Sequence, residues 1–188
     1  MFKDKVSGSL GYGRNSYDFQ EGTRVFVGPG QVMEVPSAEI LAKSKGWSLL
    51  FHPDLVRKSH LGNIIDEYSF FSYDVNEALH LSKEEQNFIF EVVRQIKKEY
   101  SQNLDKHSQR LILSNLELLL NYCTRFYDRQ FYTRTNFNKD FVSKFERVLK
   151  EYFGSSKLTE LGIPSVSYFG RMLNMSPNYL SDLLKKET

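Results

Sequence analysis

The stretch VSYFGRMLNMSPNYLSDLLK, residues 166–185, decides how the carboxyl-terminal part of this chain folds. Its apolar residues recur at helical spacing on both sides of a short polar turn. Gly170 stands where two crossing helices leave no room for a large side chain. Asn174 tolerates the positive φ that such a turn often requires, Ser176 is a good N-cap, and Pro177 suits the first position of a helix. The pattern predicts one helix-turn-helix unit.

The second helix of this unit, Pro177 to Lys186, is the element that enters a DNA major groove in proteins built on this motif. We expect its core-facing residues to be Leu180, Leu183 and Leu184. The residues expected to point at base edges are Asn178, Ser181 and Asp182. Those expected to touch phosphate or sugar are Tyr179, Lys185 and Lys186. The alternative reading is a terminal helical hairpin that serves packing alone.

The chemistry of two side chains fits base recognition. Asn178 can pair with adenine through two hydrogen bonds, and Asp182 can accept from the amino group of cytosine. The local charge fits less well. Residues 164–188 carry three basic and two acidic side chains, a net charge of about +1, which is low for a DNA-binding surface.

The sequence SVSYFGRMLNMSPNYLSDLLKKET, at 165–188, resembles the first helix-turn-helix of an AraC-type transcriptional regulator. Four earlier segments resemble one branch of that family in the same order: YGRNSYDFQEGTRVFVGPGQV at 12–32, GWSLLFHPDLV at 46–56, EYSFFSYDVNEALHLS at 67–82 and RQFYTR at 129–134. The resemblance implies a cupin-like sensor domain, a small-molecule effector, dimerisation through helices, and a second helix-turn-helix. We therefore expect this chain to be truncated at both ends.

Short runs of alternating residues, interrupted by glycine and proline, fill the first eighty positions and predict antiparallel strands. The expected strands lie near 10–12, 17–19, 23–27, 31–35 and 46–52, with a last returning strand at 78–81. Short helices are expected at 53–55 and 61–67. Strands of this kind form a sandwich or barrel, and the family resemblance makes the part cupin-like but incomplete. The fold class predicted for the whole chain is α+β.

Aromatic and basic residues on these strands are candidates for an effector pocket. The residues are Tyr12, Arg14, Tyr17 and Trp47, with Phe19 and Phe26 beside them. Aromatic rings would supply apolar area and Arg14 an anion partner. Aromatic residues on strands form plain core more often, so both interpretations stay open.

The chain becomes helical after Leu81. Ser82 and Glu85 form a capping box at the start of a helix that runs to about residue 102. A second helix is expected at about 108–127, and a polar break at 130–138. A third helix, at about 139–153, ends at the sequence Gly-Ser-Ser.

A coiled-coil-like seam marks the second helix. Its residues recur at alternating spacings of four and three: Ile112, Leu116, Leu119, Cys123 and Phe126. Apolar residues continue almost all round this helix, so it must bury more than one face. An intrachain core explains the seam as well as a subunit interface does. The family resemblance favours the interface, and we therefore predict a homodimer.

Composition bounds the remaining functions. The net charge is +2, and the longest apolar run falls well short of a membrane span. A single cysteine excludes an internal disulfide, as is typical of the cytoplasm. The four histidines His52, His60, His80 and His107 are scattered, so neither a metal, another cofactor nor catalysis is expected. The alternative of a cupin-fold enzyme would need three side chains that bind one metal ion, and the spacing of these histidines does not predict such a group.

These observations divide the chain into three parts. Residues 1–81 form the β-rich, cupin-like sensor portion, 82–135 a helical hairpin for dimerisation, and 136–188 a linker helix with the helix-turn-helix. The function they favour is a ligand-responsive, cytoplasmic transcription regulator that binds DNA, without a membrane anchor. The alternative is a small-molecule-binding or dimerisation module whose terminal hairpin has no DNA role.

Overall fold

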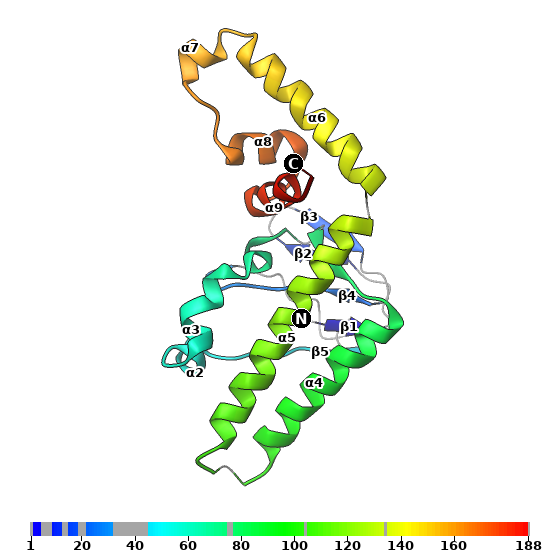
Figure 1. The fold of residues 1–188 in the computed structure, drawn as a ribbon, viewed down its shortest axis with the longest axis vertical. Coiled ribbons are helices and arrows are strands. Elements are labelled where there is room, and N and C mark those ends of the chain that lie inside the picture. Colours follow the sequence, from blue (N-terminus) through cyan, green and yellow to red (C-terminus); the bar gives the residue numbers. More distant parts are fainter. Residues whose placement is uncertain are drawn as a thin grey trace.

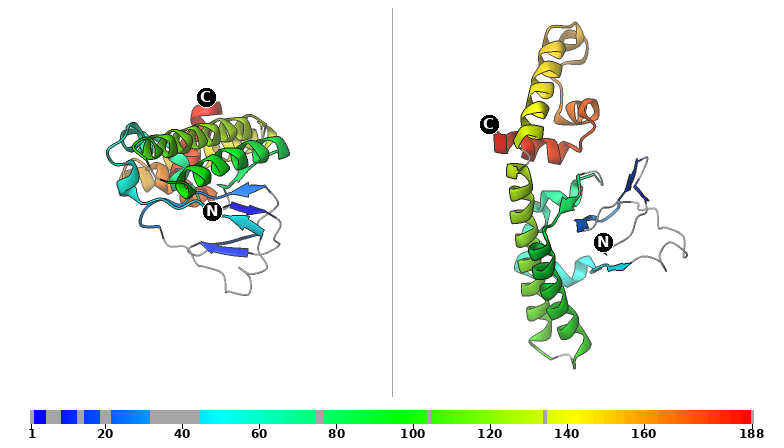
Figure 2. Two further views of the ribbon diagram at one scale, coloured as in Figure 1. Left: turned by 90° about the horizontal axis from the view of Figure 1, so that it is seen from below. Right: turned by 90° about the vertical axis from the view of Figure 1, so that its right-hand side faces the viewer.

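Two long helices, α4 (Lys83–Ser101) and α5 (Ser108–Thr133), form an antiparallel hairpin along one side of the molecule. Short strands lie on one flank of this hairpin, and the carboxyl-terminal helices lie at one end of it (Figures 1 and 2). The computed structural model describes residues 2–4, 9–12, 15–18, 22–31, 45–74, 77–103, 105–133 and 135–187. None of the helices in these ranges is long and apolar enough to cross a membrane.

The strands are short. A four-stranded antiparallel sheet has the order β5-β1-β4-β6, and β2 pairs with β3 in a separate hairpin. Their bounds are β1 Phe2–Asp4, β2 Ser9–Tyr12, β3 Asn15–Asp18, β4 Thr23–Arg24, β5 Lys45–Trp47 and β6 Leu79–His80. The structure is mostly helical. The prediction of a β-rich, partial cupin-like amino-terminal part, and with it the predicted fold class, is therefore wrong.

Packing against helices explains why the predicted strands end early. The run at 23–27 has strong β propensity, yet its ladder stops after Arg24. Phe26 packs instead on Phe70 and Tyr127, with ring centroids 4.4 and 6.2 Å away. β propensity reflects the fit of a side chain to a half-buried surface, and helical neighbours provide such a surface as well as strands do.

Short helical segments connect β5 to β6. They are α2 (Pro53–Val56), α3 (His60–Ile64), η1 (Ile65–Glu67) and η2 (Ser69–Ser72). These segments confirm the two short helices predicted from the sequence. The returning strand predicted at 78–81 is also confirmed, because β6 pairs with β4 at Thr23 opposite His80.

The capping box at the start of α4 is confirmed. The Ser82 hydroxyl accepts from the Glu85 N–H at 3.3 Å, and the Glu85 carboxylate accepts from the Ser82 N–H at 2.8 Å. The predicted polar break at 130–138 is wrong, because α5 continues to Thr133 and α6 runs from Thr135 to Phe153. Gln130 reads as polar in the sequence, but in the fold it is buried and bonded to the backbone of β6.

The predicted dimerisation seam lies inside the chain. Leu116, Leu119, Cys123 and Phe126 are buried in the common core, and Ile112 packs partly buried against it. The core also takes in Ile89, Val92 and Ile96 of α4 together with aromatic residues of η2. The seam is therefore an intrachain core, and its assignment to a subunit interface is wrong. Alternating spacing indicates burial, but it does not tell which chain covers the face.

The carboxyl-terminal unit follows α6. Its helices are α7 (Lys157–Leu161), α8 (Val166–Leu173) and α9 (Pro177–Glu187). α6 ends at Phe153, as the sequence predicts, but it begins at Thr135 and not at about residue 139. The α8–α9 pair packs on α6, and α9 also touches η2 and α5. The helix-turn-helix thus meets η2 and α5 through its second helix (Figure 1).

Candidate nucleic-acid interface

The turn between α8 and α9 has the geometry that its sequence predicts. Asn174 adopts the left-handed conformation, with φ 58° and ψ 45°. The N–H of Met175 donates to the carbonyl of Gly170 at 2.8 Å. A Cβ at Gly170 would lie 2.7 Å from the Met175 carbonyl oxygen, so only glycine fits this approach. The Ser176 hydroxyl accepts from the Tyr179 N–H at 3.2 Å and caps α9.

One face of α9 belongs to the core of the helix-turn-helix. Leu180 and Leu183 are buried, and Leu184 packs partly buried beside them, as predicted. Phe169 of α8 joins this core and makes an edge-to-face contact with Phe145 of α6, with centroids 5.1 Å apart. The leucine face fixes the rotation of α9 about its axis. It therefore determines which polar side chains point away from the unit.

The remaining surface of α9 divides into two stripes of three residues each. The first, called the outward stripe here, contains Asn178, Ser181 and Lys185. At 100° per residue these side chains span an arc of about 60°. Asn178 and Lys185 are exposed and Ser181 is half-buried. This stripe meets the geometric requirement for reading a base edge.

The second stripe, called the docked stripe here, contains Tyr179, Asp182 and Lys186, all of which the sequence assigned to DNA. Tyr179 is only 3% exposed. Its ring packs edge-to-face on Tyr73 at 5.1 Å and lies 4.9 Å from the Phe131 ring. The prediction that Tyr179 touches phosphate or sugar is therefore wrong for this arrangement.

The polar members of the docked stripe are also bonded within the chain. Asp182 accepts from the Tyr73 hydroxyl at 2.7 Å and lies 3.7 Å from the ammonium of Lys185. Lys186 forms an ion pair with Asp128 of α5, at 2.9 Å. Burial is the largest cause of the raised pKa of the Tyr73 hydroxyl, and the hydrogen bond to Asp182 raises this pKa further. Tyr73 therefore stays protonated and donates to Asp182.

A buried carboxylate holds the first residue of the α9 cap. Glu77, which is 3% exposed, accepts from the Ser176 backbone N–H at 2.6 Å and from the Ser176 hydroxyl. It also accepts from the Asp74 N–H at 2.7 Å. No sequence pattern pointed to this residue, which lies 99 positions before Ser176. Glu77 directly precedes the predicted strand at 78–81, and a single glutamate in such a place is expected to point into solvent.

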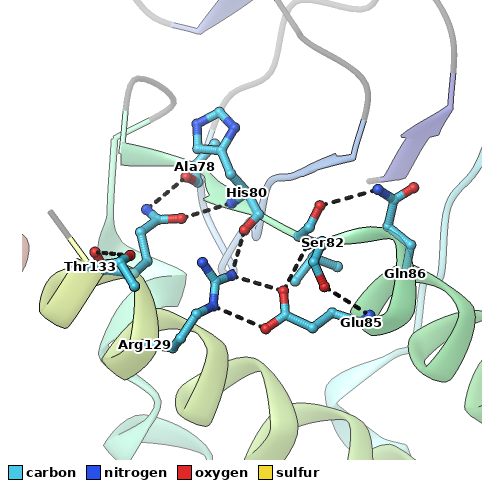
Figure 3. Close-up of polar contacts among 9 residues, drawn as sticks. Ala78, His80, Ser82, Glu85, Gln86, Arg129 and Thr133 are labelled. Carbon is cyan, nitrogen blue, oxygen red and sulfur yellow. Dashed lines mark hydrogen bonds and ion pairs between the residues drawn. The ribbon is translucent and has the colours of Figure 1, made fainter.

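The segment that carries Glu77 is fixed to α5 by a polar network (Figure 3). Arg129 donates to both carboxylate oxygens of Glu85, at 3.0 and 2.8 Å, and to the carbonyl of His80 at 2.8 Å. Gln130 accepts from the His80 N–H at 2.8 Å and donates to the carbonyl of Ala78 at 3.3 Å. Arg129 and Gln130 thus occupy backbone groups at the end of β6. Glu77 is consequently presented to α9 from a firmly anchored segment.

The titration of Glu77 makes stability depend on pH. Burial raises the pKa of Glu77 from 4.5 to about 7, against the opposing effect of its hydrogen bonds. A raised pKa in the folded state means that the folded protein binds the proton more tightly than the unfolded chain. The resulting stabilisation is complete below pH 4.5 and is lost as the pH rises through about 7.

We therefore expect Glu77 alone to lower the free energy of unfolding by up to about 3 kcal/mol between about pH 5 and pH 8. Urea unfolding of the unmodified chain and of Glu77→Gln measures this directly. The glutamine variant should lack this part of the pH dependence and keep that of other groups, including Asp74, whose pKa burial also raises. A difference between the two proteins that is constant with pH would contradict the assignment.

The proposed effector pocket lies largely outside the described residues. Arg14 is not among them, and Tyr12 and Tyr17 belong to β2 and β3 without described side chains. Trp47 is half-buried, and the guanidinium of the buried Arg24 lies 6.0 Å from its ring centroid. This is a contact between a cation and an aromatic ring. Phe26, also a candidate for the pocket, is buried against Phe70 and Tyr127 and belongs to the core.

The histidines described by the structure have local roles. His52 accepts from the Asp54 N–H at the start of α2, and His60 lies 3.4 Å from the carboxylate of Glu117. His80 has its ring nitrogen 3.4 Å from the Thr23 hydroxyl. Within the described ranges, no three histidine, cysteine, aspartate or glutamate side chains converge as metal ligands.

No family model, curated protein or solved structure matches this chain. The function is therefore inferred from the geometry of the α8–α9 unit. Within this unit the outward stripe points away from the rest of the chain, while the docked stripe and Ser176 are held by η2, α5 and Glu77.

Proposed function

We propose that this chain is a sequence-specific DNA-binding transcription regulator of the AraC type. The observation that carries the proposal is the α8–α9 turn, in which Gly170, Asn174 and Ser176 set two helices at a fixed angle and leave Asn178 exposed on the second. A long side chain on the first turn of such a helix is well placed to reach a base edge. Asn178 would bond to adenine and Lys185 to phosphate.

A second candidate function is a binding or assembly module in which the terminal hairpin serves packing. The docked stripe supports this candidate, because Tyr179, Asp182 and Lys186 contact the chain itself. The two candidates differ in what they require of the outward stripe. A packing module leaves Asn178 as an ordinary solvent-facing side chain, whereas a DNA reader depends on it.

Replacement of Asn178 by alanine tests the DNA proposal. We expect Asn178→Ala to relax the preference at one base position by about 1–3 kcal/mol, and to leave non-specific binding nearly unchanged. Selection of bound sequences from a random duplex library, for the unmodified chain and the variant, reports the preference at each position. Ser167→Ala, on α8, is a control with a change of similar size.

Two results would contradict this role for Asn178. A uniform loss of affinity over all sequences would assign its side chain to the DNA backbone. The absence of any enriched sequence at low salt, also when the contacts of Tyr73 and Glu77 with the helix-turn-helix are removed by substitution, would favour the packing module. Low salt is required because a chain of net charge +2 displaces few counterions, so its affinity at physiological salt is expected to be low.

Self-association and an effector complete the proposal. A two-fold interface would use the exposed apolar residues of the α4–α5 hairpin: Phe90, Leu111 and Leu118. A small-molecule effector would bind in the amino-terminal part that carries Trp47. A regulator of this kind works where the chromosome lies, so we place it in the cytoplasm.

A further inference from the structure

The docked stripe ties α9 to the rest of the chain on the side next to its outward stripe. Three separate interactions join it to earlier parts of the chain: Tyr179 against Tyr73 and Phe131, Asp182 with the Tyr73 hydroxyl, and Lys186 with Asp128. The docked stripe and the outward stripe adjoin on the helix. At 100° per residue, Asp182 lies about 40° from Asn178.

This small angle sets the docked contacts directly beside the face that would read DNA. A helix with its side chains is about 10–12 Å across, and the major groove is about 12 Å wide and 8.5 Å deep. A helix inserted in the groove therefore has the groove walls on both sides of its reading face. Here η2 and α5 stand where one of those walls would be, because they contact Tyr179 and Lys186.

The amino end of α9 is also occupied. Residues at the start of a recognition helix contact bases, and backbone N–H groups there commonly donate to phosphate. In this structure the N–H and the hydroxyl of Ser176 both donate to the Glu77 carboxylate. A phosphate approaching the turn would meet a carboxylate already bonded to those donors.

A half-open pocket of about 230 Å³ borders the docked interface, between η1, η2, α5 and α9. Its lining includes Tyr73, Asp128, Asp182 and Lys186, the same side chains that make the polar contacts. Water therefore reaches these polar groups from one side, and they can exchange their bonds within the chain for bonds to water when α9 leaves.

We propose that this arrangement is a closed state of the DNA-reading helix, in which Glu77 acts as a latch on Ser176, and that DNA binding requires α9 to leave η2 and α5. The inference rests on the proposed DNA-binding function and adds its regulation. In the closed state η2, α5 and Glu77 compete with DNA for α9. Any event that breaks the contacts of Glu77 and Tyr73 increases DNA binding.

Two variants open the closed state by different routes. Glu77→Ala removes the acceptor of Ser176, and Tyr73→Phe removes the hydroxyl bonded to Asp182 while it keeps the buried ring. Glu91→Ala is the matched control, because Glu91 pairs with Arg94 on the exposed side of α4. Each protein is examined at one pH near 7.5 by hydrogen exchange of the α9 amides. A titration with a labelled duplex of random sequence at low salt follows.

We expect both variants, but not the control, to speed exchange at 176–180 and to raise duplex affinity about tenfold, a change equivalent to about 1.4 kcal/mol. Unchanged exchange in both variants would overturn the latch, and duplex binding by the unmodified chain would then still support the DNA proposal. Faster exchange without duplex binding by any protein would instead overturn the DNA proposal and the competition that depends on it.

Discussion

Replacement of Leu119 by alanine is expected to lower the free energy of unfolding by about 2–5 kcal/mol. Leu119 is 2% exposed and lies in the core between α5 and its neighbours. Removal of three carbon atoms there loses apolar burial and leaves a cavity that the surrounding helices can close only in part. Urea unfolding followed by circular dichroism measures the change.

Leu161, on α7, is the control because its side chain is 69% exposed. Leu161→Ala should change the unfolding free energy by about 0.5 kcal/mol or less. The charged variants separate core from interface. Leu119→Glu should fail to fold, since it would bury a carboxylate without a partner. A folded, monomeric Leu119→Glu beside a dimeric unmodified chain, seen by sedimentation, would show that the seam lies between subunits after all.

Replacement of Gly170 by leucine is expected to destabilise the helix-turn-helix by about 1–3 kcal/mol. Its Cβ would lie 2.7 Å from the Met175 carbonyl oxygen, which belongs to the backbone and cannot rotate away. The strain therefore falls on the turn that orients α9. Thermal unfolding and the exchange rates of amides at 166–187 report the loss.

Met172→Leu, on the exposed side of the same helix, controls for a change of helix composition. It should leave the unfolding profile within about 0.5 kcal/mol of the unmodified chain. An unchanged profile for Gly170→Leu would mean that α8 and the turn separate easily. The close approach at Gly170 would then contribute nothing to the orientation of α9.

The features that could be predicted from the sequence depend on interactions between near neighbours. The capping box needs only Ser82 and Glu85, and the turn needs only Gly170, Asn174 and Ser176. Each of these residues fixes a backbone angle or satisfies a donor within a few positions of itself. Their signals are therefore the same in an isolated segment and in the folded chain.

The features that could not be predicted depend on tertiary contacts. Strand propensity at 23–27 did not reveal that Phe26 packs against a helix, and the spacing of Leu116 and Leu119 did not reveal that the chain itself covers them. Gln130 read as part of a break because its bonds to β6 join positions about fifty apart.

The candidate site shows the same division. The outward stripe follows from the helical spacing of Asn178, Ser181 and Lys185 once the leucine face is known. The docked stripe has the same spacing and also ends on a lysine, yet Tyr73 and Asp128 bind its side chains, and Glu77 binds the adjacent Ser176, from more than fifty positions away. Only the tertiary structure separates an available polar face from an occupied one.

The burial of Cys123 has a practical consequence for measurement of the α9 motion. It is the single cysteine of the chain, it is fully buried, and burial raises its thiol pKa to about 12. Maleimide reagents attack the thiolate, so the folded protein should resist them at neutral pH. In the variant Lys185→Cys, the thiol at this exposed position is then the sole reactive one. A fluorophore attached there would follow α9 by its own anisotropy, with the native thiol left in place.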